Sequence, residues 1–389
     1  MTALFQQTPT IFTIHILLFL SIFENRFTIK TATLPFEIKS PSSQSDPIDM
    51  KKLTAFLFVL FITFTAFSQI KHTYVPDILG DGFQKTTLDM GLDYNGPVVA
   101  TLIRKLSPDT TVHKAVLYIH GYDDYFFQKE MAEEYIKHGY NFYALDLRKC
   151  GRSILPGQIK FDVRNVVEYY GEIDEALQII HQEKNHWVLL SGHSMGGLVV
   201  SVYAQDRIGK ENFDALFLNS PFFDWNVSPI VRATILPIAA SEGERHPEKT
   251  RQGEDYSLYG ESLNKNFHGE WNYNLEWKML QVPVMTYGWI SAMYDAIKRV
   301  QNGLQIKKPV LVMISDRSIH PQKWTNDLFK ADAVLNVKNI KKYAANIATN
   351  VQIIEIHDGM HDLVLSPKPV RDHVYQELFT YLSNISPKK

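Results

Sequence analysis

The sequence predicts an α/β protein with a doubly wound, mostly parallel sheet, and two observations support this. Short apolar runs recur beyond residue 95, and several are continuous rather than alternating, as expected for strands buried on both faces. Helical patterns lie between these runs, and this alternation is typical of an open sheet covered by helices. Ligands of such sheets bind at the carboxyl ends of the strands.

The predicted elements follow one another from residue 97 to residue 382. Strands are expected at 97–106, 114–119, 141–145, 187–190, 215–218, 309–314 and 351–356, and helices at 128–138, 165–183, 195–208, 336–348 and 370–382. The core domain is therefore assigned to residues 69–221 and 306–389.

Residues 222–305 interrupt the alternation. They contain helical pieces and many aromatic residues, including Trp225 and Trp289, but no strand–helix repeat. A long insertion in a compact domain is usually functional, and its aromatic content favours a helical cap that lines an apolar pocket. Surface helices with no part in binding are the plainer alternative.

The first 68 residues are predicted to lie outside the folded domain. Residues 50–68 have a basic start, an apolar stretch and small residues at the end, which is typical of a secretory signal peptide. Residues 1–49 are then an upstream extension or a disordered linker. The expected location is secreted or periplasmic; a membrane tether formed by the apolar runs at 11–23 and 53–67 is the alternative.

Composition narrows the class of partner. The 389 residues are 45% hydrophobic with a net charge of −2, and no basic stripe suggests nucleic acid. The single cysteine, Cys150, cannot form an internal disulfide. A small molecule is the expected partner, and the sequence leaves the oligomeric state open.

The segment around Ser194 carries the strongest chemical signal. An apolar run ends in Gly192-His193-Ser194-Met195-Gly196, and an apolar helical pattern follows. This strand, sharp turn and helix form the pattern of a nucleophile elbow, G-x-S-x-G, in which small residues must flank the strained turn. Ser194 is therefore the candidate nucleophile.

A serine hydroxyl needs an imidazole base, and the base needs an acid that fixes its tautomer. Both follow the serine in chains with such an elbow. His361 is preferred as the base over His357, which directly abuts the strand at 351–356. Asp332 is preferred as the acid because a short apolar stretch and a helix follow it, and Asp316, just after the strand at 309–314, is the alternative.

The oxyanion of the reaction needs two N–H donors. The backbone N–H of Met195 follows the nucleophile, and the backbone N–H of Tyr122 lies in the loop after the strand at 114–119. His120 and His193 are expected to be structural. His357 and His361 are four residues apart but lie on a loop, so neither a metal site nor a cofactor is predicted.

Five motifs resemble a known family. HG at 120–121, ALDLRKCGRS at 144–153, GHSMGG at 192–197, NSPF at 219–222 and GMHD at 359–362 are similar to the monoglyceride lipase and lysophospholipase-like branch of α/β-hydrolases, grouped with serine aminopeptidase S33-type domains. The resemblance spans roughly residues 95–385. It implies the α/β-hydrolase fold with a cap inserted before the strand that delivers the acid.

One departure from the family pattern concerns the acid. The family usually has a short H-G-x-x-D after that strand, whereas this chain reads Ser315-Asp316-Arg317-Ser318. The family acid is usually followed by an apolar pair and a helix, which looks like Asp332 and the residues after it.

These observations predict a secreted serine hydrolase that cleaves carboxylic esters through an acyl-enzyme intermediate. An aromatic cap suggests an apolar acyl chain, as in a monoacylglycerol or lysophospholipid, and transient contact of the cap with a membrane surface. A small-peptide serine aminopeptidase is the alternative, with Glu242, Glu244, Glu254 and Asp255 as candidate ligands for a substrate ammonium. A non-catalytic binding protein on the same scaffold is a third interpretation.

Overall fold

The structure is a computed structural model that describes residues 72–253 and 255–387. The predicted extension at 1–49 and the signal peptide at 50–68 lie outside the described residues. Within them, no helix is both long and apolar enough to cross a bilayer.

A nine-stranded sheet forms the centre of the fold, in the order β1-β2-β3-β5-β4-β6-β7-β10-β11. The strands are β1 (Val75–Pro76), β2 (Gln84–Asp93), β3 (Gly96–Lys105), β4 (Lys114–Ile119), β5 (Asn141–Asp146), β6 (Trp187–His193), β7 (Ala215–Asn219), β10 (Val310–Ser315) and β11 (Val351–Ile356). From β5 to β11 every neighbouring pair is parallel, whereas β1, β2 and β3 pair antiparallel at one end. The predicted doubly wound, mostly parallel sheet is confirmed.

Strand β2 is a strand that the sequence analysis did not predict. Its ten residues include only three large apolar side chains, and much of the strand is exposed. An antiparallel strand with one solvated face lacks the continuous apolar run that marks a buried parallel strand. No continuous apolar run therefore marks β2 in the sequence.

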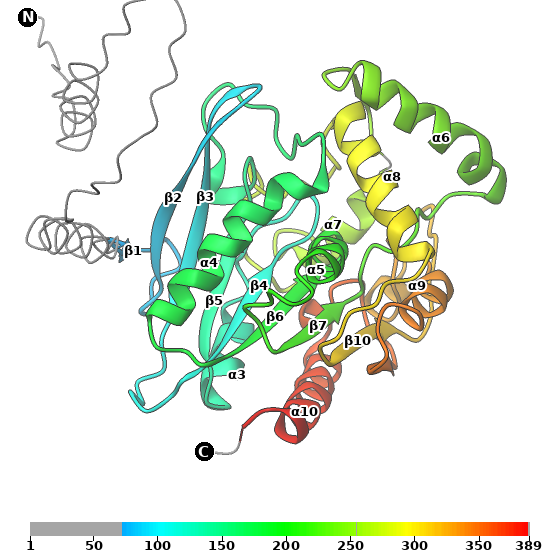
Figure 1. Cartoon of the computed structure of the whole chain (residues 1–389). Coiled ribbons are helices and arrows are strands. Elements are labelled where there is room, and N and C mark those ends of the chain that lie inside the picture. Colours follow the sequence, from blue (N-terminus) through cyan, green and yellow to red (C-terminus); the bar gives the residue numbers. More distant parts are fainter. Residues whose placement is uncertain (1–71, 254, 388–389) are drawn as a thin grey trace, which may run out of the picture. The chain divides into compact units, whose positions relative to one another are not determined.

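Helices cover both faces of the sheet, as Figure 1 shows. The helices are α3 (Lys129–Lys137), α4 (Tyr170–Gln182), α5 (Met195–Asp206), α8 (Tyr287–Gln301), α9 (Val337–Ala344) and α10 (Lys368–Ile385). Ala115 and Leu117 of β4 pack in one buried cluster with α4, α5, α8 and α9, while Val116 and Tyr118 pack in another with α3 and α10. Because successive strand residues face opposite sides, an apolar run is needed to fill both clusters.

The insertion after β7 contains α6 (Pro229–Arg245), β8 (Thr250–Arg251), α7 (Ser257–Leu263) and β9 (Met285–Thr286), followed by α8. Helices α6 and α8 lie side by side at one edge of the fold (Figure 1). Met293, Ala296 and Val300 of α8 are buried in the same cluster as α5. Helix α8 therefore packs against both the cap helix α6 and the core helix α5, and the cap boundary at 222–305 stays a prediction.

Candidate active site

Ser194 lies on the sharp turn between β6 and α5. Its φ is 50°, a left-handed backbone conformation that only close packing can hold in a serine. The packing leaves no room beside it: a Cβ on Gly192 would lie 2.5 Å from the carbonyl oxygen of Gly196, and a Cβ on Gly196 would lie 2.3 Å from that of Ile119. The two glycines thus permit the elbow, and the N–H of Ser194 donates to the carbonyl oxygen of Asn219 at 3.0 Å.

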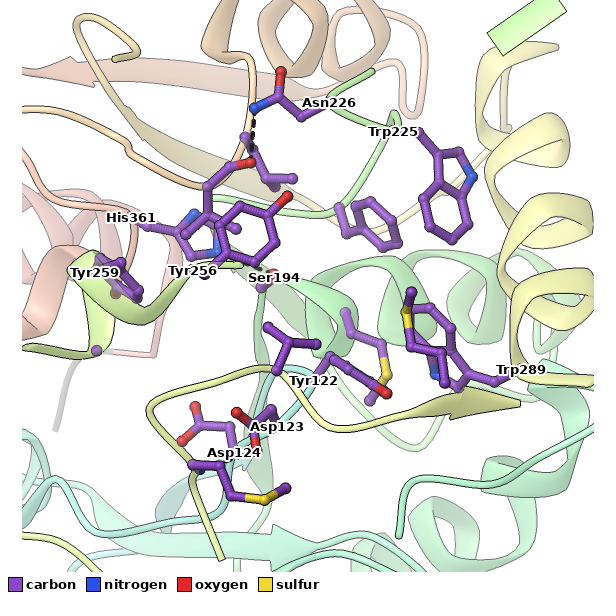
Figure 2. Close-up of a pocket in the computed structure, with 18 of the residues that line it drawn as sticks. Tyr122, Asp123, Asp124, Ser194, Trp225, Asn226, Tyr256, Tyr259, Trp289 and His361 are labelled. Atoms are coloured by element: carbon purple, nitrogen blue, oxygen red, sulfur yellow. Dashed lines mark hydrogen bonds between the residues drawn. The ribbon is translucent and has the colours of Figure 1, made fainter. Parts of the chain in front are cut away.

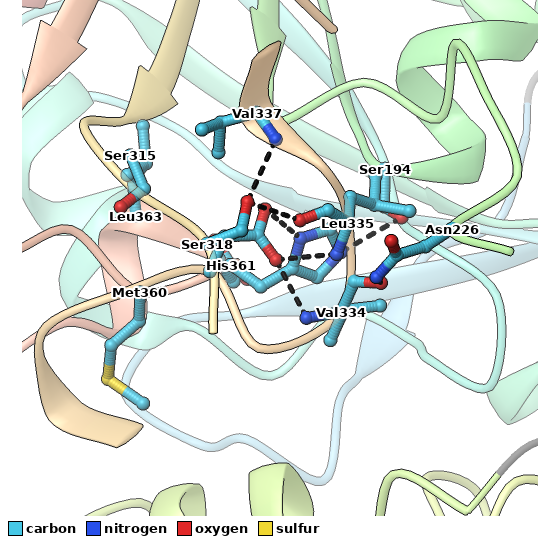
Figure 3. Close-up of polar contacts among 12 residues, drawn as sticks. Ser194, Asn226, Ser315, Ser318, Val334, Leu335, Val337, Met360, His361 and Leu363 are labelled. Carbon is cyan, nitrogen blue, oxygen red and sulfur yellow. Dashed lines mark hydrogen bonds and ion pairs between the residues drawn. The ribbon is translucent and has the colours of Figure 1, made fainter. Parts of the chain in front are cut away.

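A continuous chain of hydrogen bonds joins Ser194, His361 and Asp332, as Figure 3 shows around His361. The Oγ of Ser194 is 3.1 Å from Nε2 of His361, and Nδ1 of His361 is 2.9 Å from Oδ2 of Asp332. A carboxylate only accepts, so Nδ1 carries the hydrogen and Nε2 is free to accept the serine proton. The other oxygen of Asp332 accepts the N–H groups of Val334 and Leu335 at 2.8 and 2.7 Å.

The rival residues form a separate pair. The Nδ1 of His357 is 2.7 Å from Oδ2 of Asp316, and the side chain of His357 is 80% exposed. The long loop after β10 turns back on itself, since Ser318 bridges to Asp332 and the N–H of Asp332 donates to the carbonyl oxygen of Arg317. This return brings Asp332, rather than Asp316, to His361.

The two predicted oxyanion donors belong to segments that run beside Ser194. Met195 opens α5, whose first N–H groups have no partner within the helix. The loop after β4 approaches the elbow so closely that a Cβ on Gly121 would lie 3.3 Å from Cβ of Ser194. The Tyr122 ring in this loop packs against Trp289 of α8 with 4.2 Å between ring centroids, which holds the loop against the elbow.

The two remaining histidines hold backbone groups. The Nδ1 of His120 lies 2.7 Å from the carbonyl oxygen of Gly121, and its Nε2 accepts the N–H of Leu147. The Nδ1 of His193 lies 3.2 Å from the carbonyl oxygen of Asn219, and burial lowers the pKa of His193 below its ordinary value. Their surroundings agree with the structural roles expected of them.

A pocket opens over Ser194 and His361 and has two parts, which Figure 2 shows on either side of Tyr122. One part is apolar and is formed by the cap and α8. Its lining includes Phe222, Trp225, Val231, Ile235, Leu236, Met285, Trp289 and Ile290. The aromatic lining predicted for the cap is thus present, although Trp271 and Trp277 do not contribute to it.

The other part of the pocket is polar, and the sequence analysis missed it. Asp123 and Asp124 of the loop after β4 meet Lys278 of the cap, whose Nζ is 3.2 Å from Oδ1 of Asp124. Burial alone would lower the pKa of Lys278, but the nearby Asp124 carboxylate together with Tyr273, Asp123 and Asp362 outweighs burial, and the pKa is raised. Burial raises the pKa of Asp123 to about 8. No pattern links residues 154 positions apart in sequence, so the sequence carried no signal for this cluster.

One group in the described part of the chain has the geometry of a metal site. Asp124, His193 and Asp362 offer ligand atoms that all lie within 4.8 Å of one another. The ammonium of Lys278 already contacts Asp124, and a divalent ion there would lie beside a fixed positive charge. This donor set therefore does not fit a resident metal ion.

Comparisons with known proteins give the family. The sequence model described as serine aminopeptidase, S33, matches residues 110–368, more than half of the chain, so the chain belongs to this family of hydrolases. A soluble variant of monoglyceride lipase from Saccharomyces cerevisiae, solved with a substrate analogue, is similar in structure at 15% identity and a TM-score of 0.55, over 77% of this chain and 97% of that one.

Monoacylglycerol lipase from Paleococcus ferrophilus is similar at 17% identity and a TM-score of 0.53, over 78% of this chain and 99% of that one. At such identities the similarity shows the fold. The solved structures confirm the predicted α/β-hydrolase fold, and the family model confirms the family resemblance. None of the curated proteins matches the chain.

Proposed function

We propose that this hydrolase cleaves carboxylic esters through an acyl-enzyme intermediate on Ser194. The observation that carries the proposal is the unbroken hydrogen-bond chain from Ser194 through His361 to Asp332, which opens into a pocket with an apolar part. Asp332 and His361 are both buried, so the pair is protected from water except at the pocket.

In the proposed reaction, Oγ of Ser194 attacks the ester carbonyl carbon while Nε2 of His361 takes the serine proton. The N–H groups of Met195 and Tyr122 stabilise the negative charge that develops on the carbonyl oxygen. The imidazolium then gives its proton to the leaving alcohol, and the C–O bond breaks. Water attacks the acyl-enzyme with His361 again as the base, and Asp332 stabilises the imidazolium in both halves.

The two parts of the pocket suggest the substrate class. The apolar part suits an acyl chain, because burying it there removes apolar surface from water. The polar part suits a leaving group that carries hydrogen-bond donors, since Oδ1 of Asp124 contacts the Lys278 ammonium while Oδ2 has no hydrogen-bond partner among the described residues. A monoacylglycerol-like or lysophospholipid-like ester combines these features.

A fluorophosphonate probe tests the reaction class. We expect the folded protein to be labelled at Ser194, and Ser194→Ala to abolish both labelling and hydrolysis of p-nitrophenyl esters. Absence of labelling in folded wild-type protein would end the proposal and favour a non-catalytic binding protein. A series of p-nitrophenyl esters of increasing acyl length then measures what the apolar part accepts.

A serine aminopeptidase is the second candidate, and Asp123 and Asp124 are the observation that favours it. Carboxylates near Ser194 could bind a substrate ammonium, but Lys278 already gives Asp124 a counter-charge. The acids first considered for this role lie elsewhere: Glu242 pairs with Lys249, Asp255 accepts the N–H of Ser257, Glu244 does not line the pocket, and Glu254 is not described. Turnover of aminoacyl anilides faster than that of esters would favour the peptidase.

We further propose that the cap contacts lipid surfaces through α6. Ile230 and Ile238 of α6 are 75% and 66% exposed, and Ile235 is exposed and also lines the pocket. Arg232 on the same helix pairs with Asp224 at 3.1 Å, so its charge is partly neutralised. Replacing Ile230 and Ile238 by Ser should reduce sedimentation with phosphatidylcholine vesicles without changing turnover of a water-soluble ester; unchanged sedimentation would contradict this.

Secretion or periplasmic export, with cleavage after residue 68, also remains a proposal. It rests on the pattern at 50–68 alone. N-terminal sequencing of the natural protein tests it: a first residue near Gln69 is expected, and a peptide that covers residues 30–45 would contradict it.

A further inference from the structure

The residue that follows His361 is held by three separate parts of the fold. Asp362 is buried, and its carboxylate accepts hydrogen bonds from Nδ2 of Asn219 at 2.7 Å and from Nε2 of Gln128 at 3.3 Å. Its backbone N–H donates to Oη of Tyr259 at 3.0 Å. These partners come from the end of β7, the start of α3 and helix α7 of the cap, and the proposed reaction uses none of them.

Asn219 connects the elbow with the loop that carries the histidine. Its carbonyl oxygen accepts the N–H of Ser194 at 3.0 Å, while its side-chain oxygen accepts the N–H of Leu363 at 3.3 Å. Asn219 therefore fixes both the turn that carries Ser194 and the loop that carries His361, whose Oγ and Nε2 atoms are 3.1 Å apart.

Tyr259 is the contribution of the cap to this arrangement. The tyrosine is buried on α7, and its ring meets the His361 ring edge-on with 5.8 Å between centroids. Figure 2 shows Tyr259 beside His361 at the wall of the pocket. The cap thus touches the histidine by a ring contact and touches the next residue by a hydrogen bond.

We propose that Tyr259 and Asp362 are positioning residues for His361, so that the cap must be seated for the proposed base to reach Ser194. This inference rests on the proposed function, because it concerns the geometry of the same base. Asn219 fixes the loop from the core, and Tyr259 fixes it from the cap. A helix that lines the pocket would thereby also determine whether the hydrogen-bond chain is intact.

Replacing Tyr259 by Phe tests the hydrogen bond while keeping the ring. The buried N–H of Asp362 then lacks its acceptor, and the loop must shift to satisfy it. Because a displacement of about 1 Å can cost about 100-fold in rate, we expect kcat for a p-nitrophenyl ester to fall about 10- to 100-fold. KM should stay within about twofold, since the pocket walls keep their shape.

Tyr273→Phe is the matched control. Tyr273 is another buried cap tyrosine, and its hydroxyl donates to the carbonyl oxygen of Gly260 at 3.2 Å rather than contacting the loop that carries His361. We expect this variant to lose similar thermal stability but to keep kcat within about twofold of the wild type. Circular dichroism confirms that both variants are folded before rates are compared.

Asp362 provides a second measurement. Asp362→Asn retains an oxygen that can accept from Asn219, so its kcat should stay within about fivefold of the wild type, whereas Asp362→Ala should fall at least as far as Tyr259→Phe. The rate of fluorophosphonate labelling at Ser194 should fall in parallel with kcat in each variant, because labelling depends on the same base.

The outcomes separate this inference from the proposed function. A wild-type protein that neither labels nor turns over esters contradicts both. An active wild type with Tyr259→Phe and Tyr273→Phe equal in kcat contradicts the inference alone, as does an Asp362→Ala variant with normal kcat.

Discussion

Two Asp–His pairs lie in the loops that follow β10 and β11. Their contact distances are similar, but their exposure to water and their distance from Ser194 differ. His361 and Asp332 are 2.9 Å apart with side chains 4% and 0% exposed, whereas His357 and Asp316 are 2.7 Å apart and 80% and 28% exposed. Only the buried pair reaches Ser194. A short Asp–His contact is therefore no sign of a catalytic pair; burial and a nucleophile at Nε2 distinguish the two.

The largest expected difference between the pairs lies in their histidines. His361→Ala removes the proposed base and should lower kcat by about 10⁴- to 10⁶-fold, the loss seen when a serine hydrolase loses its histidine. His357→Ala should keep kcat within about twofold. Steady-state turnover of a p-nitrophenyl ester measures both, and a similar loss in the two variants would remove the distinction drawn here.

Replacing the two aspartates should also affect kcat unequally, but by less than replacing the two histidines. Asp332→Asn leaves His361 without a carboxylate to orient its tautomer, and kcat should fall about 10³- to 10⁴-fold. Asp316→Asn should leave the rate close to that of the wild type. If only Asp316→Asn collapses the rate, the buried pair is not the one that acts.

Asp123, a buried carboxyl group in the pocket above Ser194, should make the stability of the folded protein depend on pH, because the pKa of this carboxyl group is raised. Its pKa is raised to about 8 in the folded protein, from an ordinary value of 3.8. Between about pH 4 and 8 the folded state keeps a proton that the unfolded chain loses, so stability should fall by up to about 1.4 kcal/mol per pH unit as pH rises, and level off above pH 8.

Asp123→Asn removes this group. Asn suits the left-handed backbone at this position, where φ is 49°, and can still accept the N–H of Met279. Urea denaturation at pH 5, 7 and 9 should therefore show a smaller decline for the variant between pH 5 and 7. Parallel curves for the two proteins over that interval would count against a raised pKa.

The exposed pair gives the smallest effect. His357→Ala should change the free energy of unfolding by less than about 1 kcal/mol, because water competes for the partners of an exposed polar contact. Addition of 1 M NaCl should reduce any difference further. A larger, salt-resistant loss would mean that this pair supports the β11 loop more than its exposure suggests.

The sequence predicted the buried parts of the fold better than its surface. Strand β4 was predicted with its observed bounds, because its last five residues form a continuous buried apolar run. Strand β11 was also predicted with its observed bounds, although it is a partly exposed edge strand, because β-branched residues recur along it. The partly solvated β2 and the packing of α8 against α5 were not predicted. In α8 the spacing of Trp289, Met293, Ala296 and Val300 forms an apolar stripe, but the segment was assigned to the cap because it lacks a strand–helix repeat and is rich in aromatic residues.

In the candidate site, residues in local motifs were predicted, whereas residues that meet only through tertiary contacts were not. Ser194 was predicted because the elbow is a local motif, and the preference for Asp332 and His361 used loop position and the apolar residues that follow the acid. The polar part of the pocket escaped prediction, since Asp124 and Lys278 meet only through the folding of the cap. The return of the loop at Ser318, which brings Asp332 to His361, is likewise a tertiary contact.

The buried Lys278–Asp124 pair also bears on how substrates enter and leave. Lifting the segment around Lys278 from the core would separate two charges that lie 3.2 Å apart. Their Coulomb attraction is on the order of 5 kcal/mol at an effective dielectric constant of about 20, and hydration of the separated charges offsets only part of it. Helix α6, on another wall, packs along α8, and its ion pair to the core is the partly exposed Arg232–Asp224 pair, which water can replace more readily. Substrates and products are therefore expected to pass beneath α6, while the segment around Lys278 stays in place during turnover.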